Sequence, residues 1–111
     1  MIKFIKIYFM EFIVKDKNET IVSLGRKIGY RPMGVENNEY SLVRELDRNK
    51  YPRFHIYAKK DGKSDEFSFN LHLDQKMPSY KGSGAHAHSG EYEGDIVERE
   101  VQRIKNILEN S

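Results

Sequence analysis

The stretch EFSFNLHLD, residues 66–74, alternates apolar and polar side chains without a break, and it constrains the fold more than any other feature. Strict alternation is typical of a β-strand with one buried and one solvent-facing side. The stretch RFHIYAKK, residues 53–60, shows the same pattern, and DGKSD between the two is a turn signal. The two stretches therefore predict an antiparallel hairpin. Its apolar face carries Phe54, Ile56, Ala58, Phe67, Phe69, Leu71 and Leu73.

The same alternation indicates which polar residues share the opposite face of the hairpin. Both apolar rows must lie on one side, so the numbers of paired residues must add to an odd value. A sum of 127 places His55 opposite His72. A sum of 125 places His55 opposite Asn70, with His72 on the diagonal. In both registers the two imidazoles lie within reach of each other, because cross-strand Cβ atoms are about 4.5–8 Å apart.

Weaker patterns on both sides of the hairpin complete an α+β domain. Residues 2–14 and 40–46 are predicted strands, although Arg44 breaks the apolar row of the second. Residues 19–28 and 95–109 are predicted helices, because each carries an apolar stripe at helical spacing. We expect one antiparallel sheet of three to four strands with two helices on one face, in the order β-α-β-β-β-α. The charged residues of the second helix are expected to face water; they are Glu98, Arg99, Glu100, Arg103 and Lys105.

Length and composition favour a single domain that spans residues 1–111. Hydrophobic residues make up 38% of the chain, enough for one modest core. The absence of cysteine excludes disulfides and thiolate metal sites. The apolar N-terminal run is interrupted by charges and is shorter than the roughly 20 residues of a spanning helix, so we expect a cytoplasmic protein without a membrane partner. Residues 1–9 are read as a frayed extension, or as a segment that precedes a native start at Met10.

A glycine-rich segment, GSGAHAHSGEYEG, follows the hairpin and holds two more histidines, His86 and His88. It belongs to a long stretch without a helix or strand pattern, and such loops are uncommon in compact domains unless they are functional or disordered. Its glycines would let it fold back toward His72 and Asp74 at the end of the hairpin. His-x-Asp and His-x-His pairs point their ligands to one side of an extended segment. These four residues therefore predict a site for a divalent transition metal, with zinc as the leading candidate.

A second hypothesis needs no metal and assigns acid–base chemistry on RNA to the polar face of the hairpin. Histidine exchanges protons near neutral pH, which makes His55 and His72 candidate catalytic residues. A basic and aromatic group accompanies them and would hold phosphates and stack on bases; it consists of Arg53, Tyr57, Lys59 and Lys60. The net charge of +2 permits a nucleic-acid partner but does not by itself indicate one.

From Asn18 onward the predicted order is helix, strand, strand, strand, helix, and two short motifs fit this frame. KIGY, ending at Tyr30, looks like a Gly-aromatic pair that closes a first helix. FHIYAKKDG, residues 54–62, looks like a His-bearing strand followed by an Asp-Gly turn. In these features the chain resembles double-stranded-RNA-binding-like domains, in particular the HicA family of small mRNA-cleaving toxins. The resemblance implies that His55 is the catalytic base and that the partner is RNA. HLDQK and HSGEYEG also resemble a signature of small microbial proteins of unassigned function.

Three functions are therefore open at the level of sequence. They are RNA binding or cleavage by the histidine-bearing face, metal binding, and a protein-interaction module or homodimer that pairs through a free sheet edge. We favour RNA, because both the element order and the residues of the polar face support it. The RNA hypothesis depends on the hairpin alternation, which must place His55 and His72 on one shared polar surface.

Overall fold

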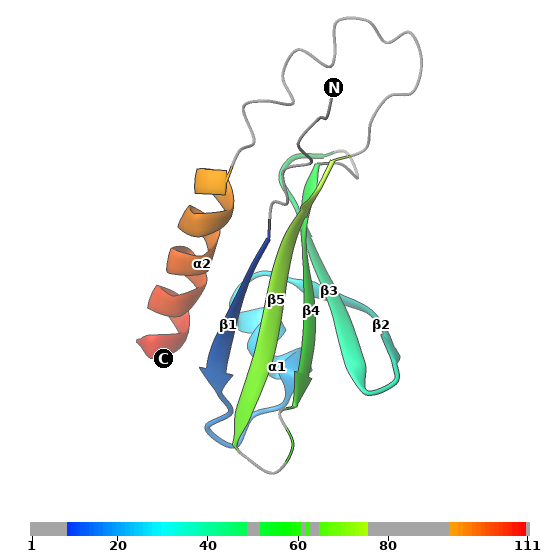
Figure 1. The fold of residues 1–111 in the computed structure, drawn as a ribbon, viewed down its shortest axis with the longest axis vertical. Helices are drawn as coiled ribbons and strands as arrows, with labels where there is room; N and C mark the ends of the chain where they lie inside the picture. Colours follow the sequence, from blue (N-terminus) through cyan, green and yellow to red (C-terminus); the bar gives the residue numbers. More distant parts are fainter. Residues whose placement is uncertain (1–8, 49–51, 61, 63–64, 76–93, 111) are drawn as a thin grey trace, which may run out of the picture.

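The computed structural model describes residues 9–48, 52–60, 62, 65–75 and 94–110, and these residues form one α+β unit (Figure 1). Its elements are β1 (Phe9–Lys15), α1 (Ile21–Lys27), β2 (Arg31–Glu36), β3 (Glu39–Glu45), β4 (Arg53–Lys60), β5 (Glu66–Asp74) and α2 (Gly94–Glu109). The predicted α+β class is confirmed. The predicted order, β-α-β-β-β-α, lacks one strand. The described elements follow each other as β-α-β-β-β-β-α. Within the described residues, no helix is both long enough and apolar enough to cross a membrane.

The described strands form one antiparallel sheet in the spatial order β1-β5-β4-β3-β2. The β4–β5 hairpin adopts a register with an odd sum, as parity predicted, and the sum is 127, with His55 paired to His72 and Arg53 paired to Asp74. β1 pairs with β5, so strands far apart in the sequence lie side by side (Figure 1). The histidine-bearing strands therefore occupy the middle of the sheet, between β1 and the β2–β3 hairpin.

β2 is the strand that the sequence pattern missed, and its composition explains why. All of its residues are exposed, so apolar and polar positions do not alternate. It contains Pro32, which an edge strand tolerates, and a β-bulge between Pro32 and Gly34 interrupts its pairing with β3. Asn37 and Asn38 close the β2–β3 hairpin with positive φ angles of 55° and 65°, as in a two-residue type I′ turn. Four described strands thus separate the helices, one more than in the layout on which the HicA resemblance depends.

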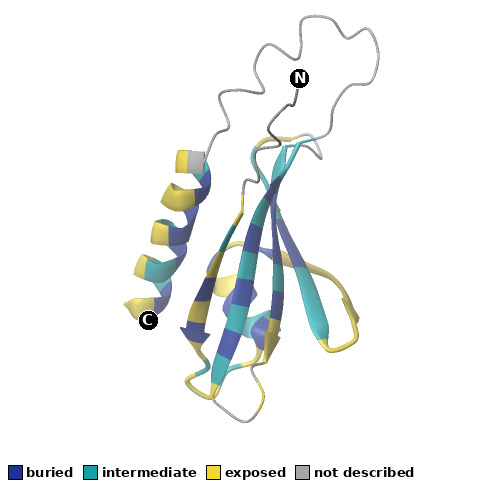
Figure 2. Ribbon diagram, in the orientation of Figure 1, coloured by how far each residue is buried: buried dark blue, intermediate teal, exposed yellow. Residues whose placement is uncertain are grey.

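The hydrophobic core lies between the helices and one face of the sheet. In Figure 2 the buried side of α2 faces the strands, while its other side is exposed. The predicted apolar face of the hairpin is buried, and Ile56, Phe69 and Leu71 are each 0% exposed. The helices contribute Ile21, Leu24, Val97, Val101, Ile104 and Leu108 to this core. We call the other side of the sheet, away from this core, the open face.

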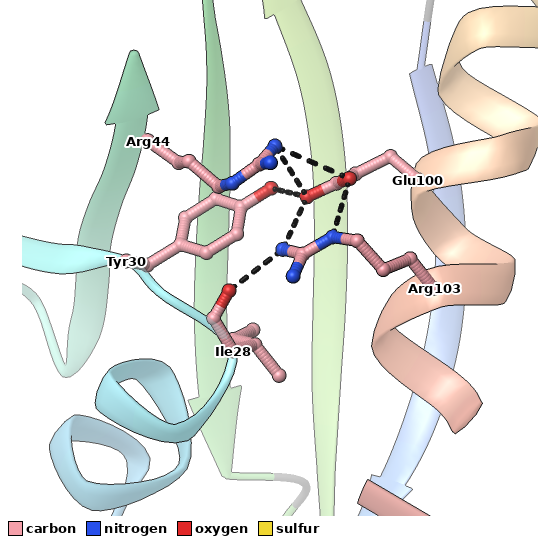
Figure 3. Close-up of polar contacts among 5 residues, drawn as sticks. All are labelled: Ile28, Tyr30, Arg44, Glu100 and Arg103. Atoms are coloured by element: carbon pink, nitrogen blue, oxygen red, sulfur yellow. Dashed lines mark hydrogen bonds and ion pairs between the residues drawn. The ribbon is translucent and has the colours of Figure 1, made fainter. Parts of the chain in front are cut away.

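A polar cluster around Glu100 is buried on the helix side (Figure 3). Glu100 is 5% exposed, so the expectation that it faces water is wrong. Its carboxylate accepts hydrogen bonds from the Tyr30 hydroxyl at 2.6 Å and from Arg103 at 2.8 and 2.9 Å. Arg44, which breaks the apolar row of β3, reaches inward to within 3.4 Å of the same carboxylate. This Glu100 cluster, made of Tyr30, Arg44, Glu100 and Arg103, joins the chain after α1 to β3 and α2, and its guanidinium groups compensate the buried charge.

Candidate functional site

Strand alternation brings a group of reactive side chains together on the open face. His55 and His72, the predicted catalytic histidines, pair across neighbouring strands and share this face, as the alternation predicted. Tyr57 projects from β4 beside them, and Asp74 ends β5. The pairing of β3 with β4 adds a residue that the sequence did not suggest, Ser41. The candidate site is thus built from the three central strands of the described sheet.

His55 lies between a serine and an aspartate, one on each side of its ring. Its Nε2 is 2.5 Å from Ser41 Oγ, and its Nδ1 is 3.1 Å from Asp74 Oδ2. An ionised carboxylate only accepts, so Nδ1 carries a proton, and Nε2 of the neutral ring accepts from the Ser41 hydroxyl. His55 is only 8% exposed and both of its ring nitrogens are occupied, so its ring is held in one orientation. We call Ser41, His55 and Asp74 the His55 cluster.

The strand registers explain why these three side chains meet. β3 and β4 pair Ser41 with Tyr57, which places Ser41 on the diagonal from His55. β4 and β5 pair Arg53 with Asp74, which places Asp74 on the opposite diagonal. Each strand therefore supplies one member of the cluster. A one-residue shift of any of these strands would turn its member toward the core and dismantle the arrangement.

Asp74 is held in its ionised form by its neighbours. The hydrogen bond from His55 lowers the pKa of Asp74 most, and Arg53 lowers it further, while burial acts in the opposite direction. Arg53 Nε is 3.3 Å from Oδ2, the same oxygen that accepts from His55. An ionised aspartate at Nδ1 fixes the imidazole tautomer and stabilises the imidazolium that forms when Nε2 takes up a proton. The geometry of a general base is therefore present at His55.

A row of aromatic rings crosses the open face from β1 to β4. The Phe9 ring stacks on His72 with a centroid distance of 5.3 Å and an interplanar angle of 17°. Tyr57 meets His72 edge-on at 5.3 Å and stacks on His55 at 4.2 Å. Burial lowers the pKa of His72, an effect that Asp74 opposes and His55 reinforces, so the His72 imidazole is neutral near neutral pH. We call Phe9, His72, Tyr57 and His55 the ring row.

The predicted basic group is divided between the two faces of the sheet. Arg53, with its side chain 14% exposed, is paired with the aspartate of the His55 cluster. Lys59 is exposed and shares the open face with Tyr57, two residues away in β4. Lys60 lies on the helix side, where its Nζ is 3.3 Å from Asp16 Oδ2. The structure thus places Arg53, Tyr57 and Lys59 on one face, with Arg53 and Lys59 at opposite ends of β4, and puts Lys60 on the other face.

The His55 cluster opens onto a hollow of about 280 Å³ beside the β2–β3 hairpin. The hollow is lined by Met33, Gly34, Val35, Glu36, Glu39, Ser41, His55 and Tyr57. Its β2 wall contains the β-bulge, and a Cβ added to Gly34 would meet no atom within 4 Å, so there the backbone borders open space. We call it the Ser41 hollow. His55 and Tyr57 belong to both the hollow and the ring row, so the two features meet at the imidazole of the cluster.

One amide beside the ring row lacks a hydrogen-bond donor. Asn70 Oδ1 is buried and has no partner among the residues that the structure describes. Asn70 pairs with Tyr57 in β4 and with Glu11 in β1, so it lies between ring-row strands. A buried acceptor without a donor costs about 1–3 kcal/mol, and such a group needs an explanation. A bound ligand with an N–H or O–H group would satisfy it.

The metal hypothesis concerns residues that the structure places only in part. His72 and Asp74 both lie on the open face, as predicted. His86 and His88 lie outside the described residues. Within residues 9–48, 52–60, 62, 65–75 and 94–110, no three His, Asp or Glu side chains are grouped closely enough to hold a metal ion. Metal binding at His72, Asp74, His86 and His88 stays a prediction.

Ser41 was missed because the register between β3, its own strand, and β4 could not be derived from the sequence. It lies in the segment Glu39–Glu45, where the alternation is short and Arg44 interrupts it. The odd-numbered positions of β3 do follow the same parity as His55, which was a usable signal once β3 was aligned with β4. Serine is common on polar strand faces, so parity alone would not have distinguished it.

Comparisons with known proteins add no relative: no family model matches the chain, and no curated protein and no solved structure matches it significantly. Function must therefore be inferred from the open face itself, from its imidazole, its rings and its hollow.

Proposed function

We propose that the protein binds single-stranded RNA on the open face and cleaves it with His55 as the general base. The observation that carries this proposal is the orientation of His55, with Nδ1 donating to Asp74 and Nε2 directed at a hydroxyl oxygen 2.5 Å away. A base must lie within about 2.6–3.2 Å of the oxygen whose proton it takes, or close to that range. His55 Nε2 is close to this range from Ser41 Oγ, the hydroxyl oxygen that it faces in the structure.

RNA supplies the hydroxyl that such a base requires. In the proposed reaction the ribose 2′-hydroxyl takes the place at Nε2 that Ser41 Oγ occupies in the structure. Its proton passes to His55, its oxygen attacks the adjacent phosphorus to form a cyclic phosphate, and the bond from phosphorus to the 5′ oxygen breaks, with that oxygen taking up a proton from water. Because burial keeps the pKa of His72 low, we assign His72 to base stacking rather than to proton donation.

The ring row supports the binding half of the proposal. Single-stranded nucleic acids bind sheets whose uncovered face carries aromatic residues, and stacking contributes about 1–3 kcal/mol per base. Phe9, at the β1 end of the row, is 39% exposed and therefore accessible to a base. Lys59 is a cation on the same face, and Asn70 Oδ1 is an acceptor for a base amino group or a ribose hydroxyl.

The resemblance to the HicA family also assigns the role of base to His55, but the extra strand β2 weakens the match in element order. We therefore base the proposal on the contacts of His55 and not on the layout of the fold. RNA cleavage by His55 needs neither a metal nor the glycine-rich segment.

The test compares two labelled oligonucleotides of the same sequence, one RNA and one DNA, at low salt. We expect both to bind, since stacking does not require the 2′-hydroxyl, and only the RNA to be cleaved. Binding is measured by fluorescence anisotropy and cleavage by gel electrophoresis. Affinity should fall steeply as salt is raised, because released counterions drive such binding.

The variant His55→Gln is expected to lower the cleavage rate about 10²- to 10⁴-fold, the usual contribution of a general base, with binding retained. The matched control is Lys60→Ala, which removes a cation of the same strand from the helix side and should change neither property. Failure of both oligonucleotides to bind would contradict the proposal, and so would cleavage that persists unchanged in His55→Gln.

A second candidate function is self-association through β2. β2 is an edge strand of the described sheet, and its Met33 and Val35 are 50% and 57% exposed. An unpaired strand with exposed apolar residues favours pairing with a strand of another molecule. Light scattering after size exclusion would support this function if it shows a dimer that Val35→Lys converts to a monomer. A wild-type monomer at high concentration would exclude it.

A further inference from the structure

Ser41 stands in the position of an activated nucleophile. Its Oγ is 2.5 Å from His55 Nε2, and the other ring nitrogen is 3.1 Å from Asp74 Oδ2. The order is serine hydroxyl, Nε2, Nδ1 and carboxylate, which is the connectivity that activates serine for attack on esters on several unrelated folds. Such a constellation is recognised by geometry and by the role of each atom, not by position in the sequence.

The Ser41 hollow gives that hydroxyl access to a small molecule. Ser41 is half-buried and lines the hollow, whose volume of about 280 Å³ fits a small ester rather than a polymer. The bulged backbone at Gly34 leaves open space opposite the β3 wall. β-Bulges are frequent next to active sites, where they re-aim side chains or end strand pairing.

The lining of the hollow indicates what kind of ester would enter. Met33 and Val35 provide apolar surface, and both are at least half exposed. The carboxylates of Glu36 and Glu39, which pair next to the β2–β3 turn, border the turn end of the same space and would disfavour an anion there. The matching ligand is therefore a small carboxylic ester that is uncharged or cationic and has a short apolar group.

We propose that Ser41 is a nucleophile that is acylated by small uncharged esters bound in the Ser41 hollow. Ser41 Oγ attacks the carbonyl carbon while its proton moves to His55 Nε2. The bond between the carbonyl carbon and the alcohol oxygen breaks, and the departing alcohol takes the proton from His55. Water then attacks the acyl group with the same base, releasing the carboxylic acid and restoring the serine. A base positioned by Asp74 at the Ser41 hydroxyl is what the structure supplies for these steps.

This activity rests on the same His55–Asp74 base as the proposed RNA cleavage, but it uses a different hydroxyl. In RNA cleavage the attacking oxygen belongs to the substrate, whereas in ester cleavage it belongs to Ser41. The two proposals therefore respond differently to replacement of Ser41. Ester chemistry requires Ser41, and RNA chemistry does not.

The test is covalent labelling of the full chain with diisopropyl fluorophosphate, followed by intact-mass measurement and peptide mapping. Attack by Ser41 Oγ forms a bond to phosphorus and expels fluoride, while His55 takes the hydroxyl proton. We expect one adduct per chain, on Ser41, and hydrolysis of p-nitrophenyl acetate by the unlabelled protein. Labelling and hydrolysis should both disappear in Ser41→Ala and fall at least about 100-fold in His55→Gln.

The matched control is Ser68→Ala, a serine of β5 on the same face that hydrogen-bonds to Glu11 and not to a histidine. It should label and hydrolyse like the wild type. The melting temperature of each variant is measured, and Ser41→Ala removes a single oxygen, so the sheet is expected to stay folded. Absence of an adduct on Ser41 in the wild type, or an adduct whose rate His55→Gln leaves unchanged, would overturn the proposal.

The outcomes also separate the two proposals. Labelling of Ser41 without RNA cleavage would support the serine nucleophile and contradict the proposed function. RNA cleavage that persists in Ser41→Ala, with no labelling of the wild type, would support the proposed function and overturn the inference.

Discussion

The two faces of the sheet carry polar clusters of similar size and very different accessibility. On the helix side, the Glu100 carboxylate is 5% exposed and accepts hydrogen bonds from a tyrosine and an arginine, with a second arginine close by. On the open face, the His55 cluster places an imidazole between a serine and an aspartate and borders a hollow of about 280 Å³. Both clusters are well satisfied, and the second borders a hollow that a ligand can enter.

The difference shows how a structural polar cluster can be told from a chemical one. In the Glu100 cluster the guanidinium groups hold permanent charges, and burial raises the pKa of Tyr30 far above its ordinary value, so the tyrosine hydroxyl keeps its proton and donates to Glu100. Its hydrogen bonds join elements that are distant in sequence. In the His55 cluster an imidazole bridges a hydroxyl and a carboxylate, which is an arrangement for moving a proton. Loss of the first should damage stability, and loss of the second should damage activity.

The largest effect is expected from Asp74→Asn. The asparagine amide donates to Nδ1, which forces the proton of the neutral ring onto Nε2 and removes the base that faces Ser41. In a serine protease the equivalent change lowers the rate about 10⁴-fold, and we expect a loss of about 10³- to 10⁴-fold in RNA cleavage here. Cleavage rates are compared with those of Asp95→Asn, an exposed aspartate of α2, which should behave like the wild type. Equal cleavage rates for the two variants would contradict a chemical role for the His55 cluster on the open face.

Glu100→Ala should lower the stability of the fold, whereas Asp74→Asn should lower the rate of RNA cleavage. It leaves two guanidinium groups and a tyrosine hydroxyl without the carboxylate, and we expect a loss of about 3 kcal/mol in the free energy of unfolding. The estimate is at the low end for a broken buried pair because the side chains of Arg44 and Arg103 are 31% and 34% exposed. Urea unfolding measures the loss, with Glu98→Ala on the exposed side of α2 as the control. A change below about 0.5 kcal/mol, the range of ordinary surface substitutions, would contradict a structural role.

Tyr30→Phe isolates one hydrogen bond of the Glu100 cluster. Tyr30 is 2% exposed and its hydroxyl donates to Glu100 at 2.6 Å. A hydrogen bond to a charged group contributes about 1.5–3 kcal/mol, so the variant should unfold more easily by about that amount. Tyr57→Phe, which removes a hydroxyl from the open face, should cost less stability. Urea midpoints that rank these two variants in the reverse order would contradict the comparison.

The smallest expected effect is on how the free energy of unfolding depends on pH in the acid range. The pKa of Asp74 is lowered in the folded protein, chiefly by the hydrogen bond from His55, relative to the ordinary value of 3.8. The folded state therefore binds this proton less readily than the unfolded state. The stabilisation is fully present above the ordinary value and is lost as the pH falls through the lowered folded value. Unfolding free energies measured from pH 7 down to about pH 2 should fall less steeply for Asp74→Asn than for the wild type. Identical slopes would show that Asp74 has no special environment.

Much of the fold follows from local pattern. The alternation in residues 53–60 and 66–74 selects a core face by itself, and it restricted the hairpin to registers with an odd sum, of which the structure shows 127. β2 was not predicted because it is exposed throughout and contains Pro32, although the Asn37-Asn38 pair was a hairpin signal. Glu100 was misjudged because charge was weighed above position: it lies three residues after Val97 and four before Ile104, on the buried stripe.

The candidate site was predictable only in part, for a physical reason. His55, His72 and Asp74 belong to one hairpin, so parity could bring them together without further information. Ser41 comes from a strand whose pairing with β4 depends on the whole sheet, and no local rule fixes that register. The hollow depends on a β-bulge in the exposed strand β2 and on the turn that joins β2 to β3, features that alternation does not reveal.

The proton position on His55 decides whether the open face is chemical, and nitrogen NMR of the imidazole rings measures it directly. We expect the neutral His55 ring to carry its proton on Nδ1 and to leave Nε2 unprotonated. The ¹H resonance of this hydrogen-bonded Nδ1–H proton should be strongly deshielded, and it should be lost in Asp74→Asn. A ring that carries its proton on Nε2 in the wild type would be donating to Ser41 rather than accepting from it. It would then be no base toward any hydroxyl at that position, and the His55 cluster would be a second structural cluster like the one around Glu100.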